Sequence, residues 1–390
     1  MNKHFSFIFQ PIRTPNFLKI FLFILVLLVC TVFIFIRPDN LDQSDFMLIA
    51  WYPGQQLLHT GSVDVNYPYP LWTVIVMLPL VIWAPKTAML LMFVCNILML
   101  SASLTLFVLI FKWELSPAMM FFYVFMSVLF LPVLSSLWLG QLTIFSLLIL
   151  MLILYFYLNK RWGLLGVVIG LSFIKPQVLL LLAGSLLFWS LWQKHWMVWR
   201  NFIIVIVSLV FASIPFVSTP VQIIGGGING HLETYIRETS TIWGIFMGLG
   251  QTWVLPLLIS FALLVWLAWE WFKFVFGITG KYISPVNLFL LTVIINLIVI
   301  PYSWMHNLIL LLPSFGYFFT SILKSRVRRK NIWIAFLFFT IYPLPIMLFI
   351  VFMNLTTVQI FQIVPVLILL PSILFFDYYY SPNLFPEVSW

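Results

Sequence analysis

Long runs of hydrophobic residues, separated by short polar segments, make up most of this chain. Runs of about 20 apolar residues are long enough to cross the hydrocarbon core of a bilayer as helices. Membrane β-strands would need short alternating segments instead, and the sequence has none. The pattern therefore predicts an all-α polytopic membrane protein with about 12 transmembrane helices. The expected spans are Phe17–Ile36, Pro70–Ala84, Ala88–Phe111, Ala118–Leu134, Leu142–Leu158, Gly163–Trp192, Phe202–Val217, Val254–Phe276, Val286–Ile300, Leu308–Leu323, Ile332–Met353 and Val358–Phe376.

One of these runs, Gly163–Trp192, is interrupted by Lys175–Pro176. Either one long broken helix or a hairpin would fit this interruption, because broken helices at membrane depth line protein-filled or wet cavities. Gly163, Gly166 and Gly170 in the same run have the spacing of small residues that let two helices pack closely. The first span is expected to be retained, since its apolar run is long and no small-residue cleavage site follows it.

Composition supports the membrane assignment. Hydrophobic residues make up 63% of the 390 residues and charged residues 7%, whereas about 25% is usual for charged residues in soluble domains. This composition excludes a soluble enzyme, a disordered chain and a disulfide scaffold. Both cysteines, Cys30 and Cys95, fall inside apolar runs, where a thiol behaves as a small hydrophobe and suggests no disulfide or metal site.

The distribution of charge predicts how the chain crosses the membrane. Five of the 19 basic residues lie in the segment 324–330, which is therefore expected to be a cytoplasmic loop, as is the N-terminus. Two larger loops, 37–66 and 218–251, are expected on the outer face, and they hold six of the ten acidic residues. No linker divides the chain, so a single transmembrane domain over residues 1–390 in the cell membrane is expected.

The first outer loop carries the acids that are the best candidates for a catalytic role: Asp39, Asp42, Asp45 and Asp64. Asp42 and Asp45 are three residues apart, so a short helix would place both carboxylates on one face. The apolar residues that follow them, Phe46 to Trp51, suggest that this helix lies in the membrane interface. A carboxylate there could act on a group delivered from the lipid, although solvated loop acids are the simpler interpretation of each one.

Several polar residues stand in apolar surroundings. An intramembrane lysine such as Lys175 is costly and marks a functional candidate, with a phosphate as a natural counter-ion, unless it reaches the interface from a helix end. Gln141 needs a partner, and a sugar hydroxyl is one possibility. His306 could hold a phosphate oxygen or relay a proton. Tyr67 and Tyr69, in a segment whose prolines start a helix, could stack on a sugar ring.

The chain contains no Walker loop, no H-E-x-x-H zinc motif and no G-x-S-x-G motif. Gly225–Gly230 formally matches G-x-G-x-x-G, but no strand precedes it, so a dinucleotide site is not expected. Any chemistry must therefore take its energy from an activated substrate.

Five motifs in a fixed order together resemble glycosyltransferase family 87, whose members are polyprenyl-phosphate-mannose-dependent mannosyltransferases with the GT-C membrane fold. The resemblance spans residues 17–313. The motifs that carry it are Ser44–Asp45–Phe46, Tyr67–Pro68–Tyr69–Pro70–Leu71, Gly140–Gln141, Lys175–Pro176, and Pro301–Tyr302–Ser303–Trp304–Met305–His306–Asn307. Asn307 stands where many relatives carry an acid, which concerns the choice of acceptor more than the type of reaction.

The resemblance implies a hexosyltransferase that moves a sugar, mannose in the first instance, from a polyprenyl monophosphate to a lipid or glycan acceptor on the outer face. Asp45 matches the catalytic aspartate and would act as general base with inversion at the sugar. Lys175, His306 and, behind them, Arg237 would meet the donor phosphate. The expected sugar or acceptor contacts are Asp42, Tyr67, Tyr69, Gln141, Tyr302, Trp304 and Asn307. No cofactor and no essential metal are expected, although Asp42 with Asp45 could bind a divalent ion.

Three other hypotheses remain open at this stage. A transporter or flippase would share the helix count and the intramembrane lysine, but it predicts paired internal repeats, which the sequence lacks. A structural membrane subunit would leave the acid cluster unexplained. An enzyme of the same class could also use a pentose such as arabinose on the same carrier.

Overall fold

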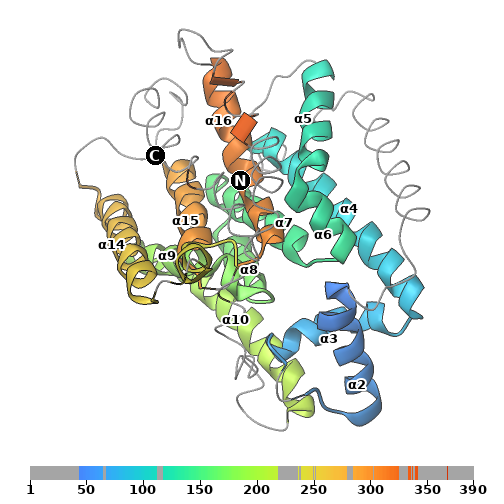
Figure 1. Cartoon of the computed structure of the whole chain (residues 1–390). Helices are drawn as coiled ribbons and strands as arrows, with labels where there is room; N and C mark the ends of the chain where they lie inside the picture. Colours follow the sequence, from blue (N-terminus) through green and yellow to red (C-terminus); the bar gives the residue numbers. More distant parts are fainter. Residues whose placement is uncertain are drawn as a thin grey trace, which may run out of the picture.

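Most of the described chain is helical, and the described part contains no strand (Figure 1). The computed structural model describes residues 44–64, 67–111, 117–217, 236, 239–248, 250, 252–278, 284–301, 303–324 and a few single positions after residue 332. The expected spans Phe17–Ile36 and Val358–Phe376, most of Ile332–Met353, and the Gly225–Gly230 motif lie outside these residues. The all-α prediction is confirmed for the described part.

The longer helices agree closely with the predicted spans. The elements in chain order are η2 (Met47–Trp51), α2 (Tyr52–Thr60), α3 (Leu71–Val81), α4 (Pro85–Ile110), α5 (Pro117–Leu129), α6 (Leu131–Leu139), α7 (Thr143–Leu158), α8 (Trp162–Ser172), η3 (Pro176–Val178), α9 (Leu180–Trp192), α10 (Trp196–Ser213), η4 (Ile214–Phe216), α13 (Ile242–Gly248), α14 (Val254–Phe276), α15 (Pro285–Val299), η5 (Met305–Leu311) and α16 (Leu312–Lys324).

Four helical segments of the described chain are long and apolar enough to cross a membrane: Pro85–Ile110, Trp196–Phe216, Val254–Phe276 and Met305–Ile322. Five further apolar helices are shorter, among them α7 and both arms of the interrupted run. The number of about 12 crossings therefore stays a prediction.

One predicted span is wrong in detail. The run Ala118–Leu134 is two helices, α5 and α6, because the chain turns to extended backbone at Phe130 and begins a new helix at Leu131–Pro132. Proline has no backbone N–H and is tolerated only in the first turn of a helix, which is where Pro132 stands. A hydropathy run cannot reveal such a break, because both halves are equally apolar.

The interrupted run forms a hairpin rather than one broken helix. The Trp162 ring at the start of α8 contacts the Trp189 ring near the end of α9, with centroids 5.5 Å apart. The turn between the two arms, which carries Lys175, therefore lies at the opposite end of the hairpin. Each arm has 11 or 13 residues, about 17 or 20 Å, and is shorter than the roughly 30 Å hydrocarbon core.

The glycines of α8 allow α10 to pack against it at very short range. A Cβ placed on Gly166 would lie 2.2 Å from the Val198 carbonyl oxygen, and one placed on Gly170 would lie 2.7 Å from the Val205 side chain. Asn201 of α10 also donates to the Gly163 carbonyl oxygen at 2.9 Å. The predicted role of these glycines in close helix packing is thus confirmed.

This packing gives a matched pair of variants. Gly166→Ala should destabilise the protein by about 1–3 kcal/mol, because the new methyl group collides with backbone that cannot move aside alone. Gly184→Ala, in α9, should be neutral or stabilising, since nothing lies within 4 Å of its added Cβ and alanine favours helix. Thermal unfolding in one detergent would compare them. Equal melting temperatures for both variants would contradict the close contact.

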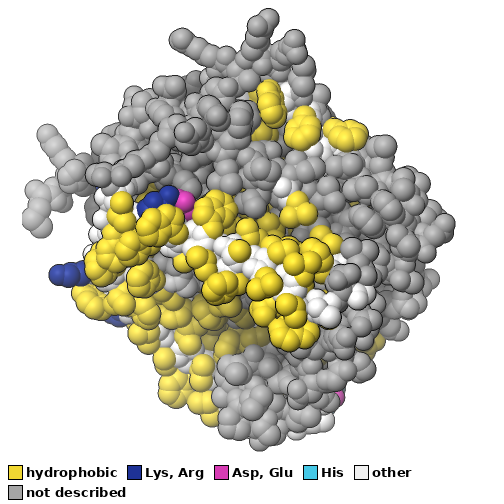
Figure 2. All heavy atoms as spheres, turned by 60° about the vertical axis from the view of Figure 1, so that its left-hand side comes forward, with side chains coloured by type: hydrophobic (Ala, Val, Ile, Leu, Met, Phe, Trp, Pro, Cys, Tyr) yellow, Lys and Arg dark blue, Asp and Glu magenta, His cyan; other side chains and the backbone are white. Residues whose placement is uncertain are grey.

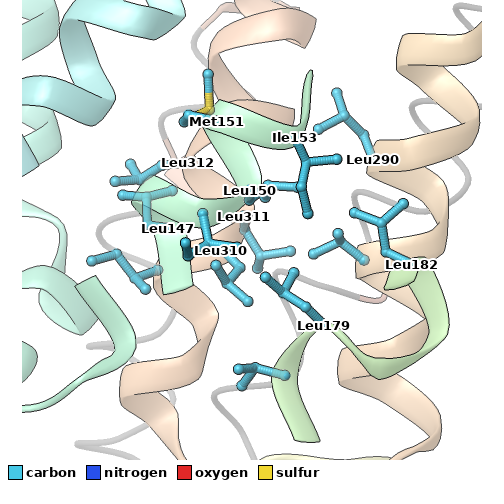
Figure 3. Close-up of a cluster of buried hydrophobic side chains, with 14 of the residues drawn as sticks. Leu147, Leu150, Met151, Ile153, Leu179, Leu182, Leu290, Leu310, Leu311 and Leu312 are labelled. Atoms are coloured by element: carbon cyan, nitrogen blue, oxygen red, sulfur yellow. The ribbon is translucent and has the colours of Figure 1, made fainter. Parts of the chain in front are cut away.

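A buried leucine-rich layer lies between the central helices (Figure 3). Leu147, Leu150 and Ile153 of α7 face Leu310 and Leu311 of η5 in this layer, and all five are buried. Every residue of α15 is buried as well, as expected for a helix that is apolar all round. This core holds the first turn of α7 and the η5 segment in fixed positions.

Hydrophobic side chains also cover a large part of the outer surface. Figure 2 shows them gathered on the face that carries α14, where Phe261 is 65% exposed, and Phe211 of α10 is 66% exposed. A soluble monomer rarely exposes so large a continuous apolar patch, so this face suits a lipid environment. Together with the four long apolar helices, it marks a membrane protein.

Candidate active site

A pocket forms where residues 45–50, the start of α7 and the tip of the α8–α9 hairpin meet. Its free space is about 290 Å³, counted with the open space at its mouth. The polar side chains in its lining come from Asp45, Tyr69, Gln141 and Lys175, and apolar residues such as Phe46 and Leu142 complete it. Residues from distant parts of the sequence therefore share one concave site, as binding sites commonly do.

Asp45, Gln141 and Lys175 form one hydrogen-bonded group in this pocket. The Gln141 Nε2 amide donates to Asp45 Oδ2, and the Lys175 ammonium donates to Gln141 Oε1 at 3.2 Å. The glutamine thus bridges a carboxylate and an ammonium through the two ends of its amide. Its predicted need for a partner is met by protein groups.

Gly140 allows this approach. Its φ of 68° lies in the left-handed region, and a Cβ there would come within 2.7 Å of Phe46 Cβ and 2.9 Å of the Met89 side chain. Glycine is the residue that takes this backbone conformation without strain. Gly140 therefore ends α6 and lets the segment that carries Asp45 lie directly against Gln141.

The polar network continues from Lys175 toward the start of η5. Lys175 also donates to Thr143 Oγ1 at 2.8 Å. The Thr143 hydroxyl donates to Asn307 Oδ1 at 3.3 Å, and the Asn307 amide donates to Ser303 Oγ at 3.1 Å. Thr143 and Ser303 were missed as single candidates by the sequence analysis, because one hydroxyl in an apolar helix is an ordinary feature.

The hairpin tip is held from two sides by side chains of other helices. From α3, the Trp72 indole donates to the Phe173 carbonyl and the Thr73 hydroxyl to the Ile174 carbonyl, both at 2.8 Å. From α15, the Asn296 amide donates to the carbonyl oxygens of residues 177 and 178, both at 3.0 Å. These bonds satisfy backbone that leaves the helical pattern, and they fix Lys175 in place.

Burial and charge set the electrostatics of Asp45. Burial raises the pKa of this carboxyl, while the hydrogen bond from Gln141 and the positive charge of Lys175 oppose that rise. Lys175 is only 2% exposed, so its charge is poorly screened by solvent. A carboxylate and an ammonium that share a secluded pocket form a pair with acid–base capacity.

Each member of this pair keeps unused hydrogen-bonding capacity. Among the described residues, Asp45 Oδ1 accepts no hydrogen bond, and Lys175 uses two of its three N–H donors. The site thus offers one acceptor and one donor to a bound molecule. No group of three His, Cys, Asp or Glu side chains in the described chain could hold a metal ion.

The other predicted site residues lie in different places. His306 is buried close enough to Lys175 for the two to interact electrostatically, and its neighbour Asn307 belongs to the network. Tyr67 packs in a separate apolar cluster, where its hydroxyl donates to the Ile49 carbonyl at 2.7 Å, and it does not line the pocket with Asp45. Trp304 is partly buried just before η5. Asp42, Arg237 and Tyr302 lie outside the described residues.

Comparison with known proteins identifies a family. No curated protein and no solved structure matches the chain. A family model, that of Glycosyltransferase family 87, matches residues 67–274. This stretch contains Gln141, Thr143 and Lys175, whereas Asp45 and His306 lie on either side of it. Because the match covers more than half of the chain, the protein belongs to glycosyltransferase family 87, as the sequence motifs predicted.

Proposed function

We propose that this glycosyltransferase moves a hexose, mannose in the first instance, from a polyprenyl monophosphate to a hydroxyl of a lipid or glycan acceptor. The observation that supports this proposal is the meeting of Asp45, Gln141 and Lys175 in one pocket. A base and a cation side by side are what a glycosyl transfer with an anionic leaving group needs.

On the acceptor side, Asp45 acts as general base in this proposal. The acceptor hydroxyl binds to the free Oδ1 and gives its proton to the carboxylate as its oxygen attacks the anomeric carbon. The bond between that carbon and the phosphate oxygen breaks, and its electron pair leaves with the phosphate. One displacement inverts the configuration at the sugar, so a second carboxylate nucleophile is not required.

On the donor side, Lys175 meets the phosphate. Its third N–H, which has no partner among the described residues, donates to a phosphate oxygen and stabilises the charge that grows there as the sugar leaves. His306 and Arg237 support the same phosphate. Tyr69 and Gln141, in the pocket lining, contact the sugar or the acceptor, as do Asp42, Tyr302, Trp304 and Asn307 in the wider proposal, whereas Tyr67 lies outside the pocket.

The membrane arrangement of the proposal follows the GT-C pattern. About 12 helices form a single transmembrane domain in the cell membrane, with a cytoplasmic N-terminus and the catalytic loop 37–66 on the outer face. The donor's polyprenyl tail stays in the bilayer. Its head group enters the pocket from the same side as Asp45, so no nucleotide site is needed.

A panel of synthetic polyprenyl-phospho-sugars tests the proposal. The purified protein in liposomes would receive mannosyl, glucosyl and arabinosyl donors with a soluble alkyl-glycoside acceptor. We expect consumption of the mannosyl donor and an inverted product, detected by mass spectrometry and NMR. Movement of the intact donor across the liposome membrane without transfer would instead support a flippase, and consumption of the arabinosyl donor alone would overturn the hexose assignment.

A further inference from the structure

Two turns at the end of the bundle opposite the pocket have the same unusual backbone conformation. Residues 159–161 join α7 to α8, and residues 193–195 join α9 to α10. In both, the residue in the left-handed conformation is a lysine: Lys160 at φ 53° and Lys194 at φ 58°. The next residue closes the same helix-ending bond in each turn, from Arg161 N to the Phe156 carbonyl and from His195 N to the Ser190 carbonyl, both at 2.8 Å.

Glycine is the usual residue at this position of the helix-ending motif, because a Cβ is strained there. This chain follows the rule elsewhere. The other left-handed positions among the described residues are all glycines, at Gly61, Gly140, Gly250 and Gly277. In the described chain, lysine takes this conformation at these two turns alone, so backbone preference does not explain the choice of residue there.

The two turns lie side by side. The Trp162 ring, directly after the first turn, stacks on the His195 ring of the second, with centroids 4.3 Å apart and planes 22° apart. Lys160, Arg161, Lys194 and Arg200 are all exposed. None of these four side chains forms an ion pair with any described residue. The surface is therefore a compact group of cations that have no ion-pair partner in the described part of the chain.

The same surface is bordered by exposed aromatic rings, with Trp192 52% and Trp196 62% exposed. Tryptophan is enriched where a membrane meets water, so these rings favour a position of the cations near lipid head groups. The 16 residues of α7 separate these turns from Gln141 and Thr143 by about 24 Å. The surface is thus distinct from the proposed active site.

We propose that these two lysine turns, residues 159–161 and 193–195, bind the phosphate groups of anionic phospholipids. Juxtaposed Lys and Arg side chains bind anionic lipids electrostatically, and the fixed turns hold both ammonium groups on one surface. The preference for basic residues in cytoplasmic loops depends on the number of Lys and Arg residues and not on their backbone conformation. A lysine at a neighbouring unstrained position would satisfy that preference equally, so it leaves the left-handed lysines unexplained.

The double variant Lys160→Gly/Lys194→Gly tests this directly. The full-length protein would be reconstituted in nanodiscs with equal parts of phosphatidylcholine and phosphatidylglycerol, and its retained lipids counted by native mass spectrometry. Each basic residue near an anionic surface contributes a factor of about five. We therefore expect the ratio of retained phosphatidylglycerol to phosphatidylcholine to fall roughly 25-fold. In phosphatidylcholine alone, the melting temperature should stay equal or rise, because glycine suits both turns.

Two controls separate charge from backbone and from position. Lys160→Gln/Lys194→Gln removes the charges without glycine and should lose the same lipid preference, whereas Lys86→Gln, an exposed lysine outside the turns, should keep it. An unchanged lipid ratio in either folded double variant would overturn the proposal. The proposal would also be overturned if inorganic phosphate raised the melting temperature of the wild-type protein in phosphatidylcholine discs as much as phosphatidylglycerol does. That result would show a site for free phosphate.

Discussion

Asp45→Asn should reduce sugar transfer by about 10²–10⁴-fold, the usual contribution of a general base. Asparagine has the same shape, and its side-chain oxygen can still accept the hydrogen bond from Gln141, but it cannot take a proton from the acceptor. Initial rates at saturating donor, measured with the sugar that the wild-type protein consumes, would quantify the loss. The melting temperature should fall, because the variant leaves the buried Lys175 ammonium without its carboxylate partner.

Asp64→Asn is the matched control for this experiment. Asp64 belongs to the same acidic segment, but it lines a different small pocket with Val63, Tyr67 and Phe216. Its variant should transfer sugar at close to the wild-type rate. If Asp45→Asn also kept near-normal turnover in a folded protein, Asp45 could not be the base and the proposed mechanism would fail.

Lys175→Gln should lower the transfer rate by about 10²–10³-fold, as expected when one preorganised donor to a developing negative charge is removed. It should also change the pH dependence. The charge of Lys175 lowers the pKa of Asp45, so its removal raises that pKa further above the ordinary value. The base must be deprotonated to act, so the acid limb of the activity profile should lie at a higher pH in the variant than in the wild type. A profile of kcat against pH would measure this shift.

Two further variants make the result for Lys175 decisive. Lys86→Gln, which removes an exposed lysine of α4, should leave the acid limb of the pH profile where it is. Asp45→Asn/Lys175→Gln should melt at a higher temperature than Lys175→Gln alone, because it leaves no unpaired carboxylate in the pocket. An acid limb that does not move in Lys175→Gln would show that the two groups are not coupled during catalysis.

The helical class and the helix positions could be predicted from the sequence, because hydropathy and length determine them. The break in the Gly163–Trp192 run was also visible, through Lys175–Pro176. Its shape stayed undecided, because one broken helix and a hairpin both fit the interruption. The hairpin resolves this, because its tip places Lys175 at the opposite end from Lys160 and Arg161. Aromatic contacts between its two arms, which no local pattern encodes, fix this shape.

The candidate site was predictable only residue by residue. Lys175 and Gln141 attracted attention because polar groups in an apolar run are costly to bury. Their pairing with Asp45 depends on the left-handed turn at Gly140 and the close approach of Phe46, which are tertiary features. Asn296 offered no comparable signal, because an amide in a buried helix finds its role only when another backbone segment comes next to it.

The positions of the hydrogen-bonded residues in the chain also determine how early during synthesis the network of the pocket can be complete. They join residues 96 and 164 positions apart in the chain, so the network between Asp45 and Asn307 is complete only after the ribosome has passed the last of them. A nascent chain that ends before Ser303 would already hold Asp45, Gln141 and Lys175, but not the Asn307 amide that fixes the Thr143 hydroxyl. The growing polypeptide therefore spends most of its translation without the complete hydrogen-bond network.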